Sequence, residues 1–416
     1  MPNSPKKLCV IVGAGHAGSV LAVQLRKEGW SGRIVLIGEE AHLPYHRPPL
    51  SKDLLAGEKE VAGIALRGQA AYETADVEMR LGERVERVIP ELRTLQLSSG
   101  EELVYDALAL CTGASVRHIE LGDGLDGVHY LRTADDAMAI RADMRPGGKA
   151  VVVGGGYIGL EVASVLARKG MHVTLLERAG RILERVTSPV ISEYFTALHQ
   201  DNGVHIVTDA VVTGIGGEGR VSSVLCEDGS EYAADMVVIG VGVNPETTLA
   251  EEAGLQVGNG IVVDEYTRTS VAEVYAAGDC TWHPSALYGR QLRLESVQNA
   301  LDQARVAAAN IAGREVKYEA LPWFWSDQYD IKLQIAGLPI DYDHFVIRGD
   351  RLNRDGRGFA VFYFRGETMV AADCVDRSAE FLVCKKLIGQ RLPVNMQALA
   401  DEAWGPDSFE AREDFF

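Results

Sequence analysis

Two stretches of the chain repeat a glycine pattern that could bind phosphate groups. Gly-x-Gly-x-x-Gly occurs at residues 13–18 as GAGHAG and again at residues 154–159 as GGGYIG. In such a turn the first glycine permits a tight bend, the second lets the backbone approach a pyrophosphate, and the third lets the next helix pack against its strand. The helix N-terminus then offers free N–H groups and the positive end of the helix dipole. Each turn therefore predicts a site for one dinucleotide.

An acidic residue follows each turn at the distance where it could accept hydrogen bonds from a ribose. Glu39 follows the first turn and Glu177 follows the second. A carboxylate beside the adenosine 2′-hydroxyl would repel a 2′-phosphate, so Glu177 favours NADH over NADPH at the second turn. Arg178 comes directly after it and could weaken that preference.

Both turns stand in the frame of strand, helix and strand that a dinucleotide site requires. We expect a buried strand at 8–12, a helix that ends at Gly29 and a second strand at 33–37. The second copy predicts the same elements, with a strand at 150–153, a helix that ends at Gly170 and a strand at 172–176. One glycine turn is weak evidence, whereas two framed copies are strong evidence.

Composition and charge exclude several classes of protein. The formal net charge of −18 disfavours nucleic acid and anionic membranes as partners. No apolar run has the length of a membrane-spanning helix, and the first ten residues lack the apolar core of a signal peptide, so a cytoplasmic protein is expected. The six cysteines form no CxxC, CxxxxC or zinc pattern, which predicts buried thiols and no metal site.

Two further stretches belong with the first turn. ALALCTGAS predicts a strand before Thr112 and Gly113, where the chain could pass from one domain to the next. VAEVYAAGDC predicts a strand that ends at Asp279, whose carboxylate could accept a hydrogen bond from a ribityl hydroxyl. A helix is expected from about Ser296, and its positive end would face an electron-rich ring.

The last part of the chain changes character. HFVIRG, GFAVFYFRG and TMVAADCVD alternate apolar and polar residues with glycine-containing breaks, which predicts an antiparallel sheet. The segment SAEFLVCKKLIG then predicts a helix. We therefore expect a smaller α+β domain at the C-terminal end.

Together these pieces resemble the two-dinucleotide-binding flavoproteins related to glutathione reductase, over nearly the whole chain. The resemblance implies an α/β fold with two Rossmann-like domains and an α+β C-terminal domain. It places the FAD domain at residues 1–113 and 246–322, the NAD domain at 114–245 and an interface domain at 323–416. One turn would hold the electron donor and the other the flavin that receives its hydride.

Within that family the chain is similar to the NADH-dependent ferredoxin and rubredoxin reductases of bacterial oxygenase systems. The likeness is carried by PYHRPPLSK, GGGYIGLEVA, LLERAGRILERV, YAAGDC and ALPWFWSDQYDIKLQIAG. Disulfide reductases of the family have a CxxxxC pair, and peroxidase relatives a single cysteine, in the region where residues 39–57 contain none. The resemblance implies that electrons leave FAD directly and pass singly to a 2Fe–2S ferredoxin of a monooxygenase or dioxygenase system.

The resemblance gives three residues a role in the redox step. Lys52 would lie near flavin N5, Glu161 would pair with Lys52 or orient the nicotinamide, and Trp325 would cover the flavin where a ferredoxin docks. Without the resemblance, Lys52 and Glu161 could equally be solvated helix charges, and the run WFW could be core. Metal ligands are not expected.

The same resemblance supplies a set of cofactor-binding positions. Arg47 and Pro48 would line the phosphate and ribityl side of the flavin, and Arg185, which could also be a plain surface arginine, would reach the NADH phosphates. The full set is Gly13, Ala14, Gly15, His16, Ala17, Gly18, Glu39, Arg47, Pro48, Lys52, Val85, Thr112, Gly113, Arg132, Gly154, Gly156, Tyr157, Ile158, Gly159, Glu161, Glu177, Arg178, Arg185, Gly242, Asp279, Ser296 and Val297.

A ferredoxin partner raises a question of charge. Small ferredoxins are usually acidic, and two acidic proteins need a local basic patch to dock. Each candidate residue could also be an ordinary solvated charge; the candidates are Arg290, Arg293, Lys317, Lys332, Lys385 and Lys386.

Three other functions stay open at this level. A rubredoxin or monodehydroascorbate reductase would share every motif named above. A protein like apoptosis-inducing factor, whose redox state controls partner or DNA binding, would need a basic surface, which the charge of −18 disfavours. A nucleotide-binding scaffold without flavin would give a colourless preparation.

Overall fold

The computed structural model describes residues 7–351 and 358–411, which form two compact units. The first unit consists of three segments: residues up to His46, Glu60–Ser115 and Val243–Ala320. The second contains Arg47–Lys59, Val116–Gly242 and the chain from Leu321 onwards. Residues 1–6, where no signal peptide is expected, lie outside the described part, and the three-domain boundaries stay a prediction.

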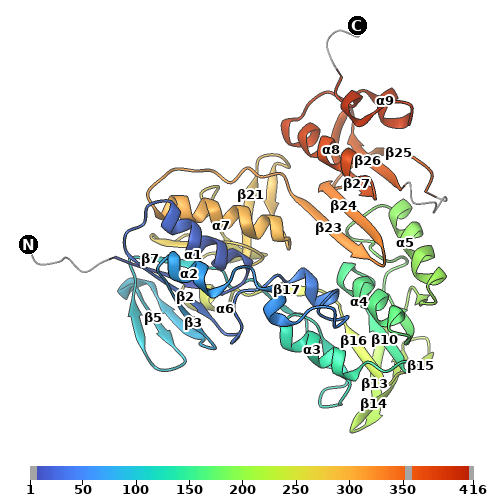
Figure 1. Cartoon of the computed structure of the whole chain (residues 1–416), viewed down its shortest axis with the longest axis horizontal. Coiled ribbons are helices and arrows are strands. Elements are labelled where there is room, and N and C mark those ends of the chain that lie inside the picture. The colour runs from blue at the N-terminus through green and yellow to red at the C-terminus, as the bar shows by residue number, and fades with distance from the viewer. Residues whose placement is uncertain (1–6, 352–357, 412–416) are drawn as a thin grey trace, which may run out of the picture. The chain divides into compact units, whose positions relative to one another are not determined.

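The first unit is built on a parallel sheet with the strand order β20-β7-β1-β2-β3. Figure 1 labels three of these strands, β7, β2 and β3. Every neighbouring pair in the sheet is parallel. The expected strand at 8–12 is β1, and the expected strand at 33–37 is β2, which runs one residue further. The strands are β1 (Leu8–Val12), β2 (Arg33–Gly38), β3 (Val77–Leu81), β7 (Ala107–Leu110) and β20 (Val274–Ala276).

The residues of β1 pack alternately into two cores, because successive side chains point to opposite faces of a strand. Cys9 and Ile11 pack with helices α1 (His16–Lys27) and α7 (Val297–Ile311), which lie side by side (Figure 1). Val10 and Val12 pack in the core that includes the small antiparallel sheet β4-β5-β6. Burial on both faces explains the uninterrupted apolar run of β1.

The other elements of the first unit are short. A four-stranded sheet has the order β18-β19-β21-β22, and β17 pairs with β8. Their bounds, with those of the remaining elements, are β4 (Val85–Ile89), β5 (Thr94–Leu97), β6 (Glu102–Val104), β8 (Ala114–Val116), β17 (Val243–Pro245), β18 (Val257–Gly258), β19 (Gly260–Val262), β21 (Thr281–Ser285), β22 (Arg290–Leu292), α2 (Gln69–Thr74) and α6 (Thr248–Glu252).

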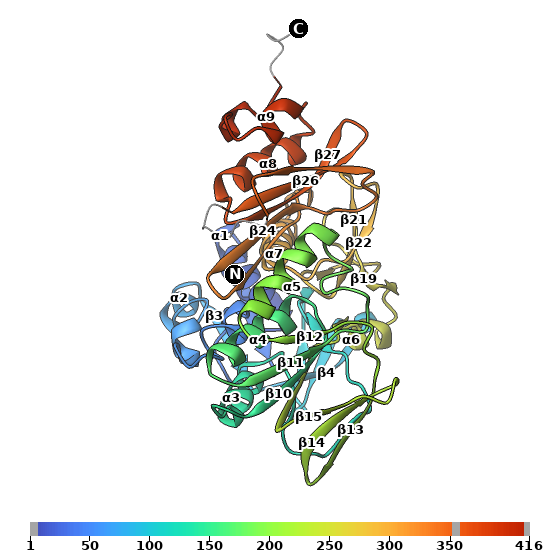
Figure 2. The ribbon, with the colours of Figure 1, turned by 90° about the vertical axis from the view of Figure 1, so that its right-hand side faces the viewer.

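The second unit begins with another parallel sheet, in the order β12-β11-β10-β16-β9 (Figure 2). The expected second strand–helix–strand unit is β10, α4 and β11. The elements of this part are β9 (Val128–Tyr130), α3 (Ala134–Asp143), β10 (Lys149–Val153), α4 (Tyr157–Arg168), β11 (His172–Leu176), α5 (Pro189–Asp201), β12 (His205–Val207), β13 (Val212–Glu218), β14 (Arg220–Cys226), β15 (Glu231–Ala233) and β16 (Met236–Ile239).

The C-terminal part is the expected antiparallel sheet, in the order β23-β24-β27-β26-β25, followed by a helix. Two parallel-sheet α/β folds and a C-terminal α+β fold therefore confirm the predicted fold class. The elements are β23 (Trp323–Gln328), β24 (Ile331–Gly337), β25 (His344–Arg348), β26 (Phe359–Arg365), β27 (Thr368–Val375), α8 (Ser378–Gln390) and α9 (Met396–Ala400).

The C-terminal sheet shares one hydrophobic core with the parallel sheet of the same unit. The core contains Val152 of β10 and Val361 of β26, and it continues through α5. The rings of Tyr194 on α5 and Phe359 on β26 meet edge to face, with centroids 5.0 Å apart. Apolar burial across this boundary explains why residues 116–242 and 321–411 belong to one compact unit.

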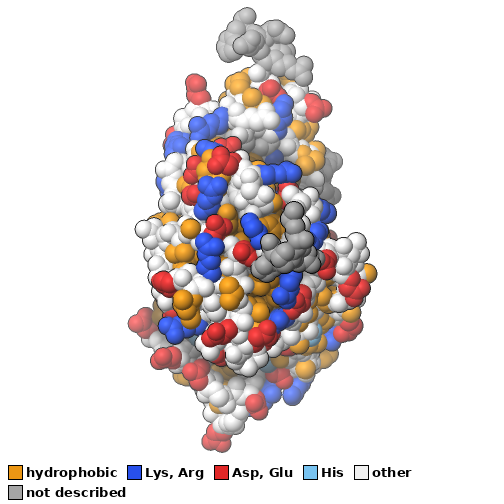
Figure 3. Space-filling view, turned by 90° about the vertical axis from the view of Figure 1, so that its left-hand side faces the viewer, with side chains coloured by type: hydrophobic (Ala, Val, Ile, Leu, Met, Phe, Trp, Pro, Cys, Tyr) orange, Lys and Arg blue, Asp and Glu red, His pale blue; other side chains and the backbone are white. Residues whose placement is uncertain are grey.

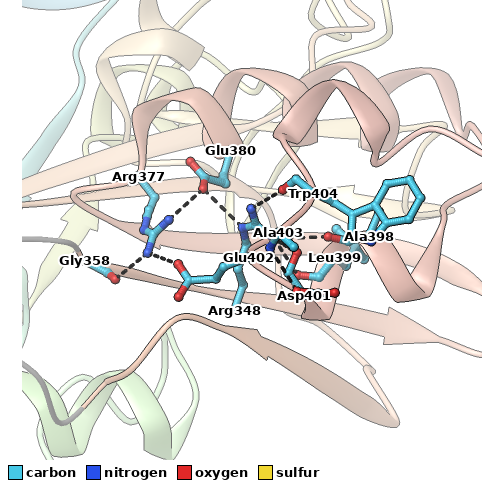
Figure 4. A network of polar contacts seen from close by, with 10 residues as sticks. All are labelled: Arg348, Gly358, Arg377, Glu380, Ala398, Leu399, Asp401, Glu402, Ala403 and Trp404. Carbon is cyan, nitrogen blue, oxygen red and sulfur yellow. Dashed lines mark hydrogen bonds and ion pairs between the residues drawn. The ribbon is translucent and has the colours of Figure 1, made fainter.

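A buried arginine fastens the end of the chain to the C-terminal sheet (Figure 4). Arg348 is 3% exposed, and its guanidinium donates to the backbone carbonyl oxygens of Ala398, Asp401 and Trp404. Its Nε lies 3.3 Å from Glu380 Oε1 on α8. One planar cation thus satisfies carbonyl groups in the last turn of α9 and in the loop that follows it.

The six cysteines are buried and form no disulfide. Burial raises the pKa of Cys9 to about 12 and raises the pKa of Cys111 and Cys374 well above the usual range. The prediction of buried thiols is confirmed.

Two negative findings concern the residues that the structure describes. None of the described helices is long and apolar enough to cross a membrane. Across residues 7–351 and 358–411, no group of three or more His, Cys, Asp or Glu side chains is placed to hold a metal ion.

Candidate nucleotide sites and redox pair

The first glycine turn has the geometry of a phosphate cradle. Gly13 adopts φ +105°, and a Cβ there would lie 2.2 Å from the carbonyl oxygen of Cys111. A Cβ on Gly18 would lie 1.9 Å from the carbonyl oxygen of Gly13, so strand and helix meet too closely for any side chain. Gly15 instead faces open space, with no atom within 4 Å of a Cβ. The first and third glycines are therefore required by the tight turn and by the close helix packing, and the second leaves the backbone open to a ligand.

Most of the positions expected at FAD gather at one edge of the first parallel sheet. The carboxyl ends of parallel strands meet at the same edge, and ligands of such sheets bind there. The Oγ of Ser296 accepts from the backbone N–H of Asn299 and so caps α7, which confirms the expected helix start. At this edge, residues 13–18 follow β1, Glu39 follows β2, Thr112 and Gly113 follow β7 and Asp279 follows β20, while Val85 begins β4 and Val297 begins α7.

The second glycine turn repeats the first in detail. Gly154 adopts φ +110°, and a Cβ there would lie 2.4 Å from the carbonyl oxygen of Gly240. A Cβ on Gly159 would lie 2.0 Å from the carbonyl oxygen of Gly154, whereas Gly156 faces open space. Among the described residues, no side chain caps the N-terminus of either α1 or α4. Both helix ends therefore present N–H groups and a positive dipole to a ligand.

Glu177 lies against the second turn. Its Oε2 accepts a hydrogen bond of 2.6 Å from the backbone N–H of Gly155, and its Oε1 accepts one of 2.8 Å from that of Ala179. Glu39 has no such anchor: its side chain is 73% exposed, and Oε1 lies 3.7 Å from Arg84 Nη1. The sequence predicts the same role for Glu39 and Glu177, but backbone hydrogen bonds fix only the Glu177 carboxylate among these two.

The segment that follows Glu177 brings two expected NADH residues together. The guanidinium of Arg185 lies 3.9 Å from the position of a Cβ on Gly242, which adopts φ +105° after β16. The backbone N–H of Leu183 donates to the carbonyl oxygen of Gly155, so this segment is fixed to the second turn. Tyr157 and Ile158 begin α4 beside it.

Lys52 and Glu161 form a buried ion pair. The Lys52 Nζ lies 2.6 Å from Glu161 Oε2, and the side chains are 17% and 2% exposed. The alternative that they are ordinary solvated charges is therefore wrong. Arg47 and Pro48 come from the same short segment as Lys52. Within the same unit, Arg47 donates to the carbonyl oxygen of Arg132.

Two serines that the sequence did not single out complete the environment of Glu161. Ser51 donates 2.5 Å to Oε2, and Ser326 donates 2.6 Å to Oε1. Further along, Gln328 Nε2 donates to Ser326, and Gln328 Oε1 lies 2.9 Å from His199 Nε2. These bonds lessen the cost of burying the Glu161 carboxylate. The two serines could have been predicted from their positions in the sequence, because Ser51 precedes Lys52 and Ser326 follows Trp325.

Tyr157 lies close to this group. Burial and then the carboxylates of Asp373 and Glu161 raise the pKa of Tyr157 well above its ordinary value. Its ring packs on Phe324 with centroids 4.8 Å apart. The first residue of the second nucleotide helix therefore contacts the strand that carries Trp325.

Trp325 stands on β23 in a run of three partly exposed aromatic residues. Its ring is 5.6 Å from that of Trp323, and the Lys385 ammonium lies 4.6 Å from the Trp323 ring centre. Phe324 packs against the core of the second unit, so the core alternative fits this residue, while Trp323 and Trp325 are partly exposed.

Four of the six candidate docking cations have acidic neighbours. Lys317 lies 3.4 Å from Glu265, Lys332 lies 3.8 Å from Asp327, and Lys386 lies 2.7 Å from Glu410. Arg293 pairs with Glu295, and Arg290 begins β22 in the first unit. Figure 3 shows that basic and acidic side chains are interspersed on one face of the molecule.

The two cradles fit two dinucleotides. Each has an open second glycine and an uncapped helix N-terminus at the carboxyl edge of a parallel sheet. The residues present therefore suit one dinucleotide at each turn.

Comparison with known proteins gives matches over most of the chain. Residues 7–304 match the family model described as pyridine nucleotide-disulphide oxidoreductase, and residues 323–405 match the one described as reductase C-terminal. Putidaredoxin reductase of Pseudomonas putida is 44% identical over 401 residues, 95% of this chain and 94% of that protein.

Two further matches also cover nearly the whole of both chains. The ferredoxin–NAD(+) reductase component of the anthranilate 1,2-dioxygenase system of Burkholderia cepacia is 39% identical over 405 residues, 96% of this chain and 98% of that protein. The crystal structure of the covalent putidaredoxin reductase–putidaredoxin complex matches with a TM-score of 0.93 at 42% identity, over 97% of this chain and 98% of that one.

Proposed function

The chain belongs to the pyridine nucleotide-disulphide oxidoreductase family, and on that premise we propose that it is an NADH-dependent ferredoxin reductase. It binds FAD at the first glycine turn, takes hydride from NADH bound at the second, and passes single electrons to a 2Fe–2S ferredoxin. That ferredoxin serves a bacterial monooxygenase or dioxygenase system.

One observation carries this proposal: the chain keeps two complete dinucleotide cradles but has no accessible thiol. All six cysteines are buried, and burial raises the pKa of those nearest the first turn, Cys9, Cys111 and Cys280. Thiol relays need a thiolate. Electrons must therefore leave this reductase without a sulfur intermediate.

The residues of the chain bind and orient, while the cofactor supplies the redox chemistry. FAD, when bound, accepts two electrons as a hydride and releases them one at a time. The two helix N-termini hold the two pyrophosphates, and hydride transfer needs only that the rings are held at near-attack distance. Glu161 fixes the Lys52 ammonium, and Ser51 and Ser326 fix Glu161, so that the cation has one position.

We place Trp325 beside the flavin, and Arg290, Arg293, Lys317, Lys332, Lys385 and Lys386 at the ferredoxin surface. Support comes from the partial exposure of the aromatic run and from Lys385, which lies over the Trp323 ring. An acidic ferredoxin would compete with the acidic neighbours that these lysines now have.

Steady-state kinetics test the function and the docking surface together. The purified protein should be yellow, and NADH should reduce it and support reduction of a 2Fe–2S ferredoxin. Lys317→Glu and Lys386→Glu should each raise the KM for ferredoxin severalfold and leave ferricyanide reduction unchanged. Lys169→Glu, an exposed lysine at the end of α4, is the matched control.

Other outcomes of the same assay point elsewhere. Faster turnover with a rubredoxin than with any 2Fe–2S ferredoxin would replace the proposed acceptor. A colourless protein that NADH does not bind would overturn the function itself. Unchanged ferredoxin kinetics in both lysine variants would remove only the docking surface.

A further inference from the structure

A buried carboxylate of the C-terminal sheet holds the segment that follows the second nucleotide strand. Asp373 on β27 is 0% exposed, and its Oδ2 accepts a hydrogen bond from the hydroxyl of Thr187. The hydroxyl of Tyr363 on β26 donates 2.6 Å to the same oxygen and lies 2.8 Å from Ser188 Oγ. Two consecutive residues of one segment are therefore fastened to two adjacent strands of the sheet.

This contact is well isolated from water. Thr187 is 6% exposed, and Ser188 is 1% exposed. The second oxygen of Asp373, Oδ1, has no hydrogen-bond partner among the described residues. Loss of the Thr187 hydroxyl would leave the buried carboxylate with a single donor, which is costly. Core packing alone would not require a buried carboxylate with hydroxyl donors. The hydrogen bonds of Asp373 therefore have a second effect, which is to hold the attached segment.

The attached segment, residues 178–188, follows β11, contacts the second glycine turn and leads into α5. Near its start, Arg181 donates to the carbonyl oxygen of Thr187 and to Ser192 on α5. In its middle, Leu183 N–H donates 2.9 Å to the carbonyl oxygen of Gly155. At its end, Thr187 and Ser188 form hydrogen bonds with the C-terminal sheet.

Arg185 lies on this segment two residues before the anchored threonine. Its guanidinium is beside Gly242, at the carboxyl edge of the parallel sheet that bears the second turn. The Arg185 side chain is exposed, so little packing holds it in place. Its position therefore depends on the position of the backbone that carries it. A displacement at Thr187 would move the cation away from the phosphates of a bound dinucleotide.

We propose that Asp373 and Tyr363 are positioning residues for NADH. Through Thr187 and Ser188 they hold residues 178–188 so that Arg185 faces the nucleotide at the second turn. The C-terminal sheet, which the sequence connects with the flavin and the ferredoxin, thus also sets the affinity for the electron donor. This inference rests on the proposed function, because it takes the second turn to be the NADH site.

The test compares Thr187→Val with Thr187→Ser in FAD-loaded protein. The valine removes the hydroxyl without changing the size of the side chain, and the serine keeps it. For Thr187→Val we expect the dissociation constant of NAD⁺ by calorimetry, and the KM for NADH, to rise about tenfold. The kcat with ferricyanide should stay within about twofold, because the redox pair is not touched. Thr187→Ser should resemble the unchanged protein.

A second measurement does not depend on activity. Trypsin cuts after arginine, so release of the anchor should speed cleavage at Arg181 and Arg185 severalfold in Thr187→Val alone. Thr213→Val on β13, where the threonine is exposed, is the control for a threonine-to-valine change in the same unit. If Thr187→Val does not fold, Thr187→Ala takes its place.

Each result decides the matter. Equal affinity for NAD⁺ in all variants would overturn the proposal, and so would equal weakening in the serine and valine variants. Faster cleavage without weaker binding would show that the anchor is only structural, which also overturns it. A protein whose unchanged form does not bind NADH would instead contradict the proposed function.

Discussion

The Ser326 hydroxyl donates a 2.6 Å hydrogen bond to Glu161 Oε1, and so joins the strand that carries Trp325 to the helix that begins at the second glycine turn. The other oxygen of Glu161 binds Ser51 and Lys52. Three segments distant in the sequence therefore meet at one buried carboxylate. The pair is fixed by its surroundings and not only by mutual attraction.

This geometry makes Lys52→Met more harmful than Glu161→Gln. The methionine leaves a buried carboxylate without its cation, which costs about 3–5 kcal/mol in unfolding free energy. The double variant Lys52→Met/Glu161→Gln should recover part of that loss, because both charges are gone. Urea unfolding of the three variants measures the coupling, and rapid-mixing reduction by NADH measures the redox effect. Additive losses would mean that the two residues do not interact.

The second acidic residue should set the choice of nicotinamide cofactor. Glu177→Gln removes the charge that would repel a 2′-phosphate, so the ratio of kcat/KM for NADPH to that for NADH should rise about tenfold or more. Glu184→Gln, an exposed residue of the neighbouring segment, removes the same charge without touching the turn. An unchanged ratio in Glu177→Gln would assign Glu177 to holding Gly155 alone.

The thiols should be inert in the native protein. Every cysteine is buried, and burial raises the pKa of Cys9 to about 12 and that of Cys384 above its ordinary value. Titration with a thiol-reactive disulfide reagent should find almost no reactive group until denaturant is added, and NADH oxidation should persist throughout. Rapid loss of activity in step with one modified thiol would bring a sulfur relay back into consideration.

The C-terminal segment should depend on Arg348 (Figure 4). Arg348→Met roughly keeps the length of the side chain but removes the guanidinium that donates to the carbonyl groups of Ala398, Asp401 and Trp404. We expect a loss of about 3–5 kcal/mol and faster amide hydrogen exchange across 396–409. Arg365→Met, at the exposed end of β26, should change neither quantity.

Asp373 should make stability depend on pH in an unusual direction. Burial raises the pKa of Asp373 from 3.8 to about 6, although hydrogen bonds from Thr187 and Tyr363 oppose this rise. A carboxyl group whose pKa is raised in the folded state stabilises most below its unfolded pKa, and that contribution is lost as pH rises through about 6.

The variant Asp373→Asn does not titrate, so its stability relative to the unchanged protein should increase between pH 4 and pH 7. The increase should reach about 3 kcal/mol, because each unit of pKa shift corresponds to about 1.4 kcal/mol. Urea unfolding at several pH values in this window gives the difference. A difference independent of pH would place the pKa of Asp373 near its ordinary value.

The sequence by itself determined the local features of this protein. Residues 13–18 and 154–159 show their function within a few positions, because a tight turn and a close approach of helix and strand can be made only by glycine there. The buried strands β1 and β10 and the antiparallel strands of the C-terminal part follow from periodicity in short windows. Similarity to the family then implied that Lys52 and Glu161 pair, and the structure brings them together.

Only the tertiary structure decided what surrounds those local features. Ser326 meets Glu161 across 165 positions, and Asp373 meets Thr187 across 186. No local sequence pattern predicts these contacts, because a serine or an aspartate on a strand can equally well face solvent. The core that joins β10 to β26 arose in the same way. Apolar burial brings distant segments together, and a polar group trapped between them must then find its partner there.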